Sequence, residues 1–361
     1  GRAPVEPGSQ AALLGDAITL FQASYDVLRD DEGAPILDES GQPIPIVTDP
    51  GLALVNALSP QAHYGMADFT RQAMRTQLRT AMRTAPMATA GKGAMFAAIH
   101  STNAGSDGGV NGAGYDIDME GAVAGLRYTV APNIQVGGML GMLGGDIKGS
   151  HIDTDGSGIM FGLFGEYVLD PATRTILSSS LAYGSYEYDA KRHSFGGPVF
   201  SNDIGSSAWE FALGIESTVY QTERFRVIPR GAMRYLNGDV NGFREQGDGV
   251  QMQVDSINMT SLLLELGVDA EFDVNECITL RAHLGGLTDL KGSGGYVSGS
   301  FLGGGLPVGV SAPGIDGEAF IFGLGGSYEL NEATRFDLNW RSELRDGSQN
   351  THILSLGTRV T

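Results

Sequence analysis

Four arginines recur at every fourth residue of the stretch RQAMRTQLRTAMR, at Arg71, Arg75, Arg79 and Arg83. Residues four apart lie on neighbouring turns of a helix, so their guanidinium groups form one basic stripe. Guanidinium groups pair strongly with carboxylates, which they bind through two parallel hydrogen bonds. The chain as a whole is acidic, with a formal net charge of -19. Taken alone, the stripe fits a membrane-surface helix, a calmodulin-target helix, a solvated helix face or a helix that meets carboxylates.

The motifs of common enzymes and metal sites are missing from the sequence. It contains no phosphate-binding glycine loop, HExxH helix, GxSxG elbow or CxxC pair. The segment IDTDGSG (152–158) alternates aspartates like a calcium loop but lacks that loop's final glutamate, so we interpret it as an acidic outer loop. We predict no metal, no cofactor and no enzymatic activity. None of the histidines has a partner at zinc-ligand spacing: His63, His100, His151, His193, His283 and His352.

Composition narrows the class of protein. The chain has 54 glycines and only 18% charged residues, a charged fraction below that of ordinary soluble domains. The acidic pI near 4.6 argues against a nucleic-acid partner. The single cysteine, Cys277, excludes an internal disulfide framework and is interpreted as a small buried or lipid-facing side chain. Low charge and abundant glycine are typical of a chain whose apolar residues face outward, as in a membrane barrel.

Charge and periodicity divide the chain into three parts. Residues 1–60 hold nine acids against two bases and are partly helical in pattern, so we interpret them as an acidic connector from a missing passenger. Residues 61–90 hold the four arginines against one acid and form a basic helix, with Ser59 and Pro60 at its start. Residues 91–361 change to a period of two, which predicts half-exposed β-strands.

About twelve alternating segments follow residue 91. They are separated in turn by tight turns and by long connections rich in Gly, Asp and Ser, at 106–113, 190–203, 240–253 and 291–316. Outer-membrane barrels have short turns at one end and longer loops at the other. The predicted fold is all-β: a twelve-stranded antiparallel transmembrane β-barrel with an N-terminal α-helix that plugs the lumen. Strands are expected near 93–105, 114–130, 133–147, 155–169, 173–189, 204–220, 224–239, 254–272, 276–290, 317–330, 333–346 and 350–361.

The two faces of these strands differ in chemistry. Aromatic residues on the apolar face are predicted to form girdles at the membrane interfaces: Tyr128, Tyr167, Trp209, Tyr220, Phe225, Tyr235, Phe272, Tyr328, Phe336 and Trp340. Charges of both signs on the opposite face, mixed with Gly and Ala, are predicted to line a hydrated lumen: Arg127, Glu166, Glu210, Glu216, Arg230, Arg234, Glu265, Asp269, Arg281, Arg341 and Glu343. We expect the arginine stripe to pair with lumen carboxylates of this set.

The order of these segments resembles the β-domain of type Va autotransporters of Gram-negative bacteria. LVNALSPQAHYGMADF (54–69) looks like the prelude to the pore helix, and EGAVAGLRYTV (120–130) and ILSSSLAYGSYEYDAKR (176–192) look like the second and fifth strands. GEAFIFGLGGSYEL (317–330), TRFDLNWRSEL (334–344) and HILSLGTRVT (352–361) look like the last three. The family usually ends on an aromatic residue, so we expect one more residue, Phe or Trp, after Thr361.

The resemblance implies an outer-membrane translocator that exports or anchors an N-terminal passenger at the cell surface. Its implied partners are that passenger, the barrel-assembly machinery, and outer-membrane lipid and lipopolysaccharide. Short turns would be periplasmic and long loops extracellular. Some relatives cleave themselves between two asparagines of the pore helix, but residues 62–90 contain no Asn, so this reaction is not carried over.

Three alternatives stay open at this point. The first is a porin-like transport barrel, which predicts a conducting lumen. The second is a structural outer-membrane anchor that binds a surface or envelope protein through residues 1–60. The third is an outer-membrane enzyme, for which His151 and His193 are the available outer-loop bases.

Overall fold

A computed structural model describes residues 9–23, 25–27, 45–47, 56–84, 93–106, 114–291, 295–312, 318–345 and 350–361. Most of the predicted connector, residues 85–90 of the predicted basic helix and residues 107–113 of the predicted loop 106–113 lie outside these residues. No helix among those described is long and apolar enough to cross a membrane. The elements before the barrel are α1 (Gln10–Ala23), the paired strands β1 (Tyr25–Val27) and β2 (Pro45–Val47), the 3-10 helix η1 (Pro60–His63) and α3 (Tyr64–Thr84).

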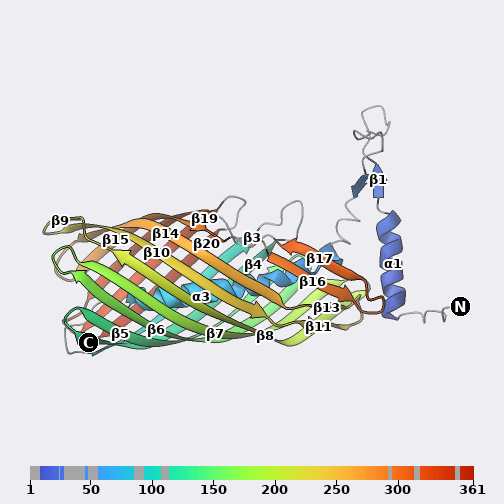
Figure 1. Cartoon of the computed structure of the whole chain (residues 1–361), viewed down its shortest axis with the longest axis horizontal. Coiled ribbons are helices and arrows are strands. Elements are labelled where there is room, and N and C mark those ends of the chain that lie inside the picture. The colour runs from blue at the N-terminus through green and yellow to red at the C-terminus, as the bar shows by residue number, and fades with distance from the viewer. Residues whose placement is uncertain are drawn as a thin grey trace.

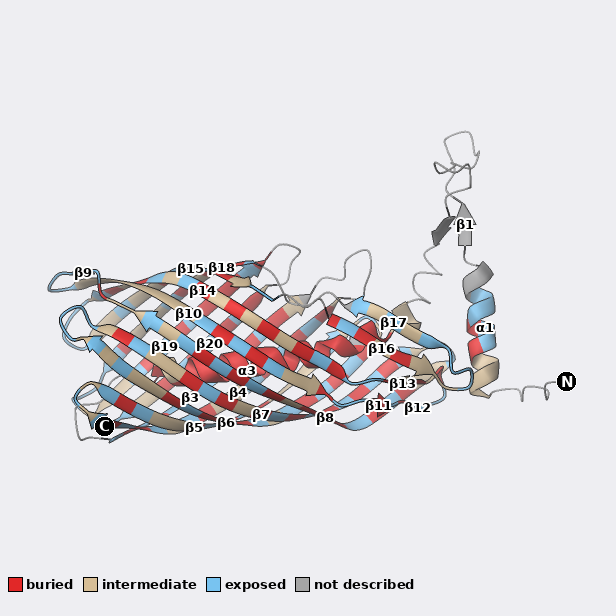
Figure 2. Cartoon of the chain, in the orientation of Figure 1, coloured by how far each residue is buried: buried red, intermediate tan, exposed pale blue. Residues whose placement is uncertain are grey.

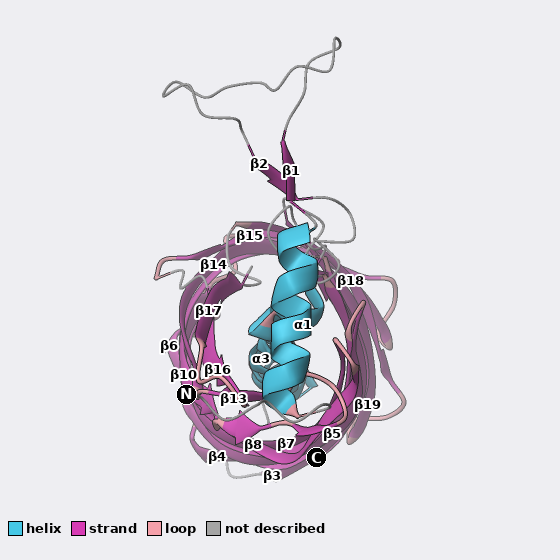
Figure 3. Ribbon diagram, turned by 90° about the vertical axis from the view of Figure 1, so that its right-hand side faces the viewer, coloured by secondary structure: helices cyan, strands magenta, loops and turns pink. Residues whose placement is uncertain are grey.

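Twelve strands form one closed antiparallel barrel (Figures 1 and 3). Each strand pairs with its neighbour in the sequence, β10 pairs directly with β8, and the last strand closes the barrel against the first. Closure leaves no unpaired edge in the sheet, as a lipid environment requires. The barrel strands are β3 (Gly93–Ser106), β4 (Tyr115–Ala131), β5 (Ile134–Gly149), β6 (Ile152–Asp170), β7 (Thr175–Ser194), β8 (Gly197–Glu216), β10 (Phe225–Val240), β14 (Ile257–Asp273), β15 (Ile278–Asp289), β18 (Ala319–Glu329), β19 (Thr334–Arg345) and β20 (Thr351–Val360).

The predicted fold class is confirmed, while several predicted loops are wrong. Residues 190–203 are not a long loop, because β7 and β8 continue as one hairpin to Ser194 and Gly197. Residues 152–158 begin β6 rather than forming an acidic loop. The long connections 240–253 and 291–316 carry further strands: β11 (Phe243–Arg244), β12 (Gln246–Gly247), β13 (Met252–Val254), β16 (Gly295–Phe301) and β17 (Pro307–Ala312). The remaining strand, β9 (Tyr220–Gln221), lies between β8 and β10.

The barrel wall is uneven in height. Strands β4 to β8 have 16–20 residues each, whereas β15, β18, β19 and β20 have 10–12. About ten residues are enough for a tilted strand to cross a membrane. The long strands exceed this length by about six to ten residues. At the loop end, β11, β13, β16 and β17 form a separate four-stranded sheet, in which β16 contacts β14 and β11 contacts β8 (Figures 1 and 3).

Helix α3 lies inside the barrel along its axis (Figures 1 and 2). Nearly all of its residues are buried, and it contacts β3 to β8, β10, β14, β16 and β20. Its first residue, Tyr64, lies at the loop end beneath Gly295, and its last, Thr84, lies beside Gly357 near the short turns. The loop-end half of the lumen is a continuous apolar core that includes Phe69, Met74 and Ile117. This half differs from the hydrated lumen that the sequence predicts, because apolar side chains of α3 fill it.

Candidate functional site

The arginine stripe lies on one continuous helix. The Ser59 hydroxyl accepts a hydrogen bond from the Gln61 amide (3.1 Å) at the start of η1, which satisfies one of the free donors of a helix start. Arg83 lies in the last turn, where a cation is favoured by the helix dipole. Arg71, Arg75 and Arg79 are buried, while Arg83 is half-buried. Each arginine therefore requires partners inside the lumen.

Arg71 finds its carboxylate on its own helix. Its guanidinium pairs with Asp68, three residues earlier, and donates to the Tyr64 hydroxyl at 3.1 Å. The guanidinium also lies over the Tyr64 ring, 5.4 Å from its centroid. Asp68 in turn accepts a hydrogen bond from the Tyr115 hydroxyl on β4. This ion pair lies within α3, and Tyr115 links it to the barrel wall.

The next two arginines face strand β14. Arg75 donates to the Ser261 hydroxyl at 2.8 Å. Arg79 forms two ion pairs of 3.0 Å, one with Glu265 of β14 and one with Glu343 of β19. Ser261 and Glu265 are four residues apart on the strand, so both point inward, and they match successive arginines of the helix.

The two glutamates also bind arginines of the wall. Arg341 lies 3.1 Å from Glu265 and 2.9 Å from Glu343. Arg345 lies 2.8 Å from Glu343. All of these groups are buried, and buried ion pairs are costly unless each charge is fully paired. Arg79 therefore joins α3 to a network in which arginines of the wall already bind both glutamates.

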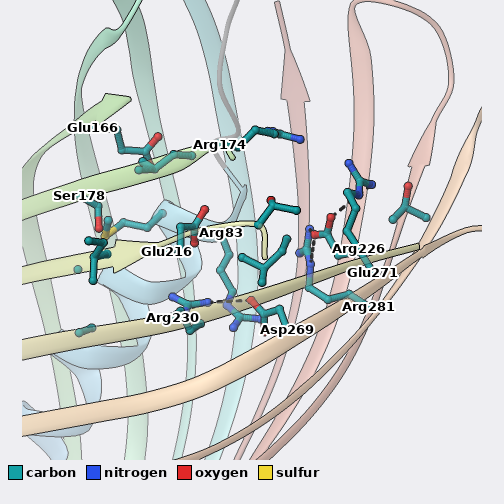
Figure 4. Close-up of a pocket in the computed structure, with 18 of the residues that line it drawn as sticks. Arg83, Glu166, Arg174, Ser178, Glu216, Arg226, Arg230, Asp269, Glu271 and Arg281 are labelled. Atoms are coloured by element: carbon teal, nitrogen blue, oxygen red, sulfur yellow. Dashed lines mark hydrogen bonds and ion pairs between the residues drawn. The ribbon is translucent and has the colours of Figure 1, made fainter. Parts of the chain in front are cut away.

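Arg83 ends at a cavity below the helix. The cavity has a volume of about 700 Å³ and is lined mainly by charged side chains. Figure 4 shows Arg83 extending towards Arg230 and Asp269. Asp269 is already bonded to Arg230 (3.2 Å) and to His283 (2.6 Å). Within the described part of the chain, Arg83 makes no direct ion pair, which distinguishes it from Arg79.

The other lumen charges predicted from the sequence point inward and mostly form cross-strand pairs. Arg127 pairs with Glu166 at 3.0 Å, and Arg234 pairs with Glu210 at 2.8 Å. Arg281 pairs with Glu271 on the neighbouring strand at 2.7 Å. Glu216 lines the same cavity as Arg83. These pairs fix the inner wall around the helix.

The predicted girdle residues all lie on the outward face. Each is exposed on the surface of the isolated chain except Phe225, which is half-buried. Three lie further along their strands from the short turns: Trp209, Tyr235 and Trp340. The others lie near the short turns: Tyr128, Tyr167, Tyr220, Phe225, Phe272, Tyr328 and Phe336. This arrangement leaves aromatic rings at two levels of the outward face.

Several residues at the loop end escaped the sequence analysis. Tyr188 of β7 bonds the Thr70 hydroxyl (2.6 Å) and donates to the carbonyl of Met66 (3.1 Å). Glu245, in a predicted loop, pairs with Arg192 and His63. For Tyr188, the alternation in SYEYDA is a usable signal. For Glu245, no periodic pattern surrounds the residue, so its position depends on the loop fold.

These features define a class: an outer-membrane type β-barrel whose lumen is filled by a helix of its own chain. The profile of the autotransporter beta-domain family matches residues 95–341. The chain belongs to this family and is an autotransporter translocator domain. Members of the family lie in the outer membrane and carry a passenger. No curated protein sequence matches the chain.

Solved structures show the same fold at low sequence identity. The translocator domain of the autotransporter NalP from Neisseria meningitidis aligns with a TM-score of 0.64 and 17% identity, over 86% of this chain and 99% of that one. The β-domain of the Bordetella autotransporter BrkA gives 0.55 and 17%, over 74% and 98%. The transport unit of the Escherichia coli autotransporter AIDA-I gives 0.55 and 9%, over 81% and 98%.

Proposed function

We propose that α3 stays in the lumen after export and closes the barrel, so that the domain anchors its passenger without leaving a pore. The observation that carries this proposal is Arg79, which bridges two strands of the wall through Glu265 and Glu343. Withdrawal of the helix would separate Arg79 from both carboxylates, which would keep only the wall partners Arg341 and Arg345. Breaking a buried ion pair by loss of one member costs about 3–5 kcal/mol.

The finer assignments belong to the same proposal. Residues 1–60 serve as connector to the passenger, 61–90 as pore helix and 91–361 as barrel. The short turns face the periplasm and the loop end faces outward. The barrel-assembly machinery inserts the domain, and outer-membrane lipid and lipopolysaccharide contact its outward face. The exposed apolar side chains of that face, such as Leu140, support contact with lipid.

Single-channel conductance in planar bilayers tests the plug. We expect the full chain to be closed, and a version lacking residues 61–86 to be open. Replacing Arg71, Arg75, Arg79 and Arg83 by Glu places like charges against the wall and is expected to open the pore. The matched control replaces the same four residues by Lys, which retains their charge. Steady conductance of the full chain, equal to that of the deletion, would refute the plug and favour a porin-like barrel.

Cys277 provides a test of orientation. It is the only cysteine of the chain. It is exposed in the short turn between β14 and β15, so the prediction of a buried or lipid-facing side chain is wrong. A membrane-impermeant maleimide is expected to label it only after the outer membrane has been permeabilised. The control is Lys191→Cys in a Cys277→Ser background, which places the thiol at the loop end. Labelling of Cys277 in intact cells would reverse the proposed orientation.

A further inference from the structure

The segment that precedes α3 passes through the loop end of the barrel. Residues 57–63 run beneath the loop sheet, where β16 and β17 both contact η1. The Gln61 side chain donates to the carbonyl of Ser311 on β17 at 3.3 Å. The His63 ring packs edge-on against Phe243 of β11, with centroids 4.9 Å apart. Two different outer loops therefore cover this segment.

A buried carboxylate in one of those loops joins the parts. Glu245 binds Arg192 of β7 through two hydrogen bonds, of 2.7 Å to Nε and 2.6 Å to Nη2. The same carboxylate lies 3.0 Å from Nε2 of His63 and accepts the Met252 amide at 2.9 Å. The side chains of Glu245, Arg192 and His63 are each 1% exposed. Burial opposes ionisation of Glu245, but its hydrogen bonds from Arg192 and His63 outweigh burial and lower its pKa to about 2.

Arg192 also reaches the segment itself. Its Nη1 donates to the carbonyl of Ala57, and its Nη2 donates to the carbonyl of Val250 at 3.1 Å. Residues before η1 and at its end are thus both bound: Ala57 by Arg192, and His63 by Glu245. Neither contact involves the arginine stripe of α3, which lies deeper in the lumen.

We propose that Arg192 and Glu245 form an outer-mouth clamp that grips residues 57–63 and holds the surface part of the chain on the barrel. This inference deepens the proposed function and rests on it, because it takes the loop end as the outer side. Tension applied from the N-terminal side reaches Ala57 and His63 before it reaches Tyr64, the first residue of α3. The clamp therefore bears load that would otherwise draw the helix out of the lumen. Opening it exposes a buried charge, which makes release slow.

The clamp is tested with a thiol placed in the gripped segment. The full chain carries Ala57→Cys and Cys277→Ser and is inserted into lipid vesicles, and reaction with a soluble maleimide is followed over time. Glu245→Gln is expected to speed labelling about tenfold or more, because Arg192 loses its charged partner. The matched control is Asp273→Asn, which removes an ion pair with Arg226 at the opposite end of the barrel and is expected to leave the rate unchanged.

Labelling and conductance separate this inference from the plug. Glu245→Gln is expected to remain non-conducting, because Arg79 keeps its partners, while its labelling rate rises. A labelling rate equal to the parent in folded Glu245→Gln overturns the clamp, whatever the conductance. Should Glu245→Gln not fold, His63→Gln leaves the Arg192 pair in place and removes one contact to a charged group. That variant is expected to label at least about threefold faster, and a parental rate overturns the clamp.

Discussion

Arg79 of the pore helix and Glu265 of β14 form an ion pair of 3.0 Å inside the barrel wall. The same glutamate binds Arg341, so the helix and the wall share one carboxylate. Because both arginines need Glu265, the helix contributes to the electrostatics of the wall as well as filling its lumen. Arg83, four residues later, lies at a cavity instead. The two arginines are chemically identical and differ in their surroundings.

This contrast gives a first prediction. Arg79→Ala is expected to weaken the docking of α3 by about 3–5 kcal/mol, because Glu265 and Glu343 lose a buried partner. Single-channel recording should then show frequent openings. Arg83→Ala is the matched control and should leave the channel closed for most of the record. Equal behaviour of the two variants would show that the ion pairs of Arg79 do not hold the helix.

Gly295 gives a second prediction at the loop end. A Cβ atom added to this residue would overlap the Tyr64 ring, and Tyr64 is fully buried. Gly295→Ala is therefore expected to displace Tyr64 and to destabilise the protein by about 1–3 kcal/mol, as overpacking does. Unfolding in urea measures the loss. Gly144→Ala, where the nearest atom is 3.6 Å away, is the control and should be nearly neutral.

A row of aspartates gives a third prediction. Asp118, Asp146, Asp155 and Asp189 are direct partners on four adjacent strands and lie on the outward face beyond the apolar belt. Like charges directly opposite each other destabilise a sheet by roughly 0.2–1 kcal/mol per pair. Asp146→Asn is therefore expected to stabilise the folded barrel by about that amount at pH 8, measured by urea unfolding.

The gain should depend on pH. A hydrogen bond with Asp146, then burial and nearby aspartates, raise the pKa of Asp155 above its usual range. A raised pKa in the folded state means that stability falls as pH rises through that pKa. The advantage of Asp146→Asn should accordingly shrink when the pH is lowered. Asp153→Asn is the control, because Asp153 lies opposite Lys148 and Lys191; a stabilising effect there would contradict the role of like charges.

The girdle gives a fourth prediction. Trp209 and Trp340 are the only tryptophans of the chain and are 54% and 37% exposed on its outward face. In vesicles, bromines placed near the lipid carbonyls should quench their fluorescence more than bromines at the chain ends, because indole rings favour the interface. Trp209→Phe and Trp340→Phe separate the two signals. Strong quenching by aqueous acrylamide would place the rings outside the membrane.

The barrel could be predicted because apolar and polar residues alternate within the sequence of each barrel strand. Alternation in WEFALGIESTV or RFDLNWRSELR depends only on which face meets lipid and which meets the lumen. Some strands of the outer loops are too short to show this alternation, since β11 and β12 have two residues each. Their pairing follows from long-range contacts. Glu245 could not be recognised for the same reason.

The helix was partly predictable. The four-residue spacing predicted a stripe and carboxylate partners, and Arg79 meets Glu265 and Glu343. It did not indicate that Arg71 pairs with Asp68 of the same helix. Asp68 is three residues before Arg71, a spacing at which helix side chains touch, so this pair was readable in principle.

The uneven wall places two kinds of protein interior within one closed sheet. Towards the short turns, the distribution of side chains is the reverse of that in a water-soluble protein: apolar side chains face outward and charged side chains face the lumen. Beyond the membrane on the side of β4 to β8, the polarity returns to that of a water-soluble protein, with aspartates outside and Phe69, Met74 and Ile117 within. Along a single strand such as β6, the outward-facing side chains therefore change from apolar near the short turn to polar near the loop end. At the loop end, packing is stabilised by the removal of apolar side chains from water, whereas near the short turns the apolar side chains face lipid. Solvent conditions that destabilise the packing at one end therefore need not destabilise it at the other.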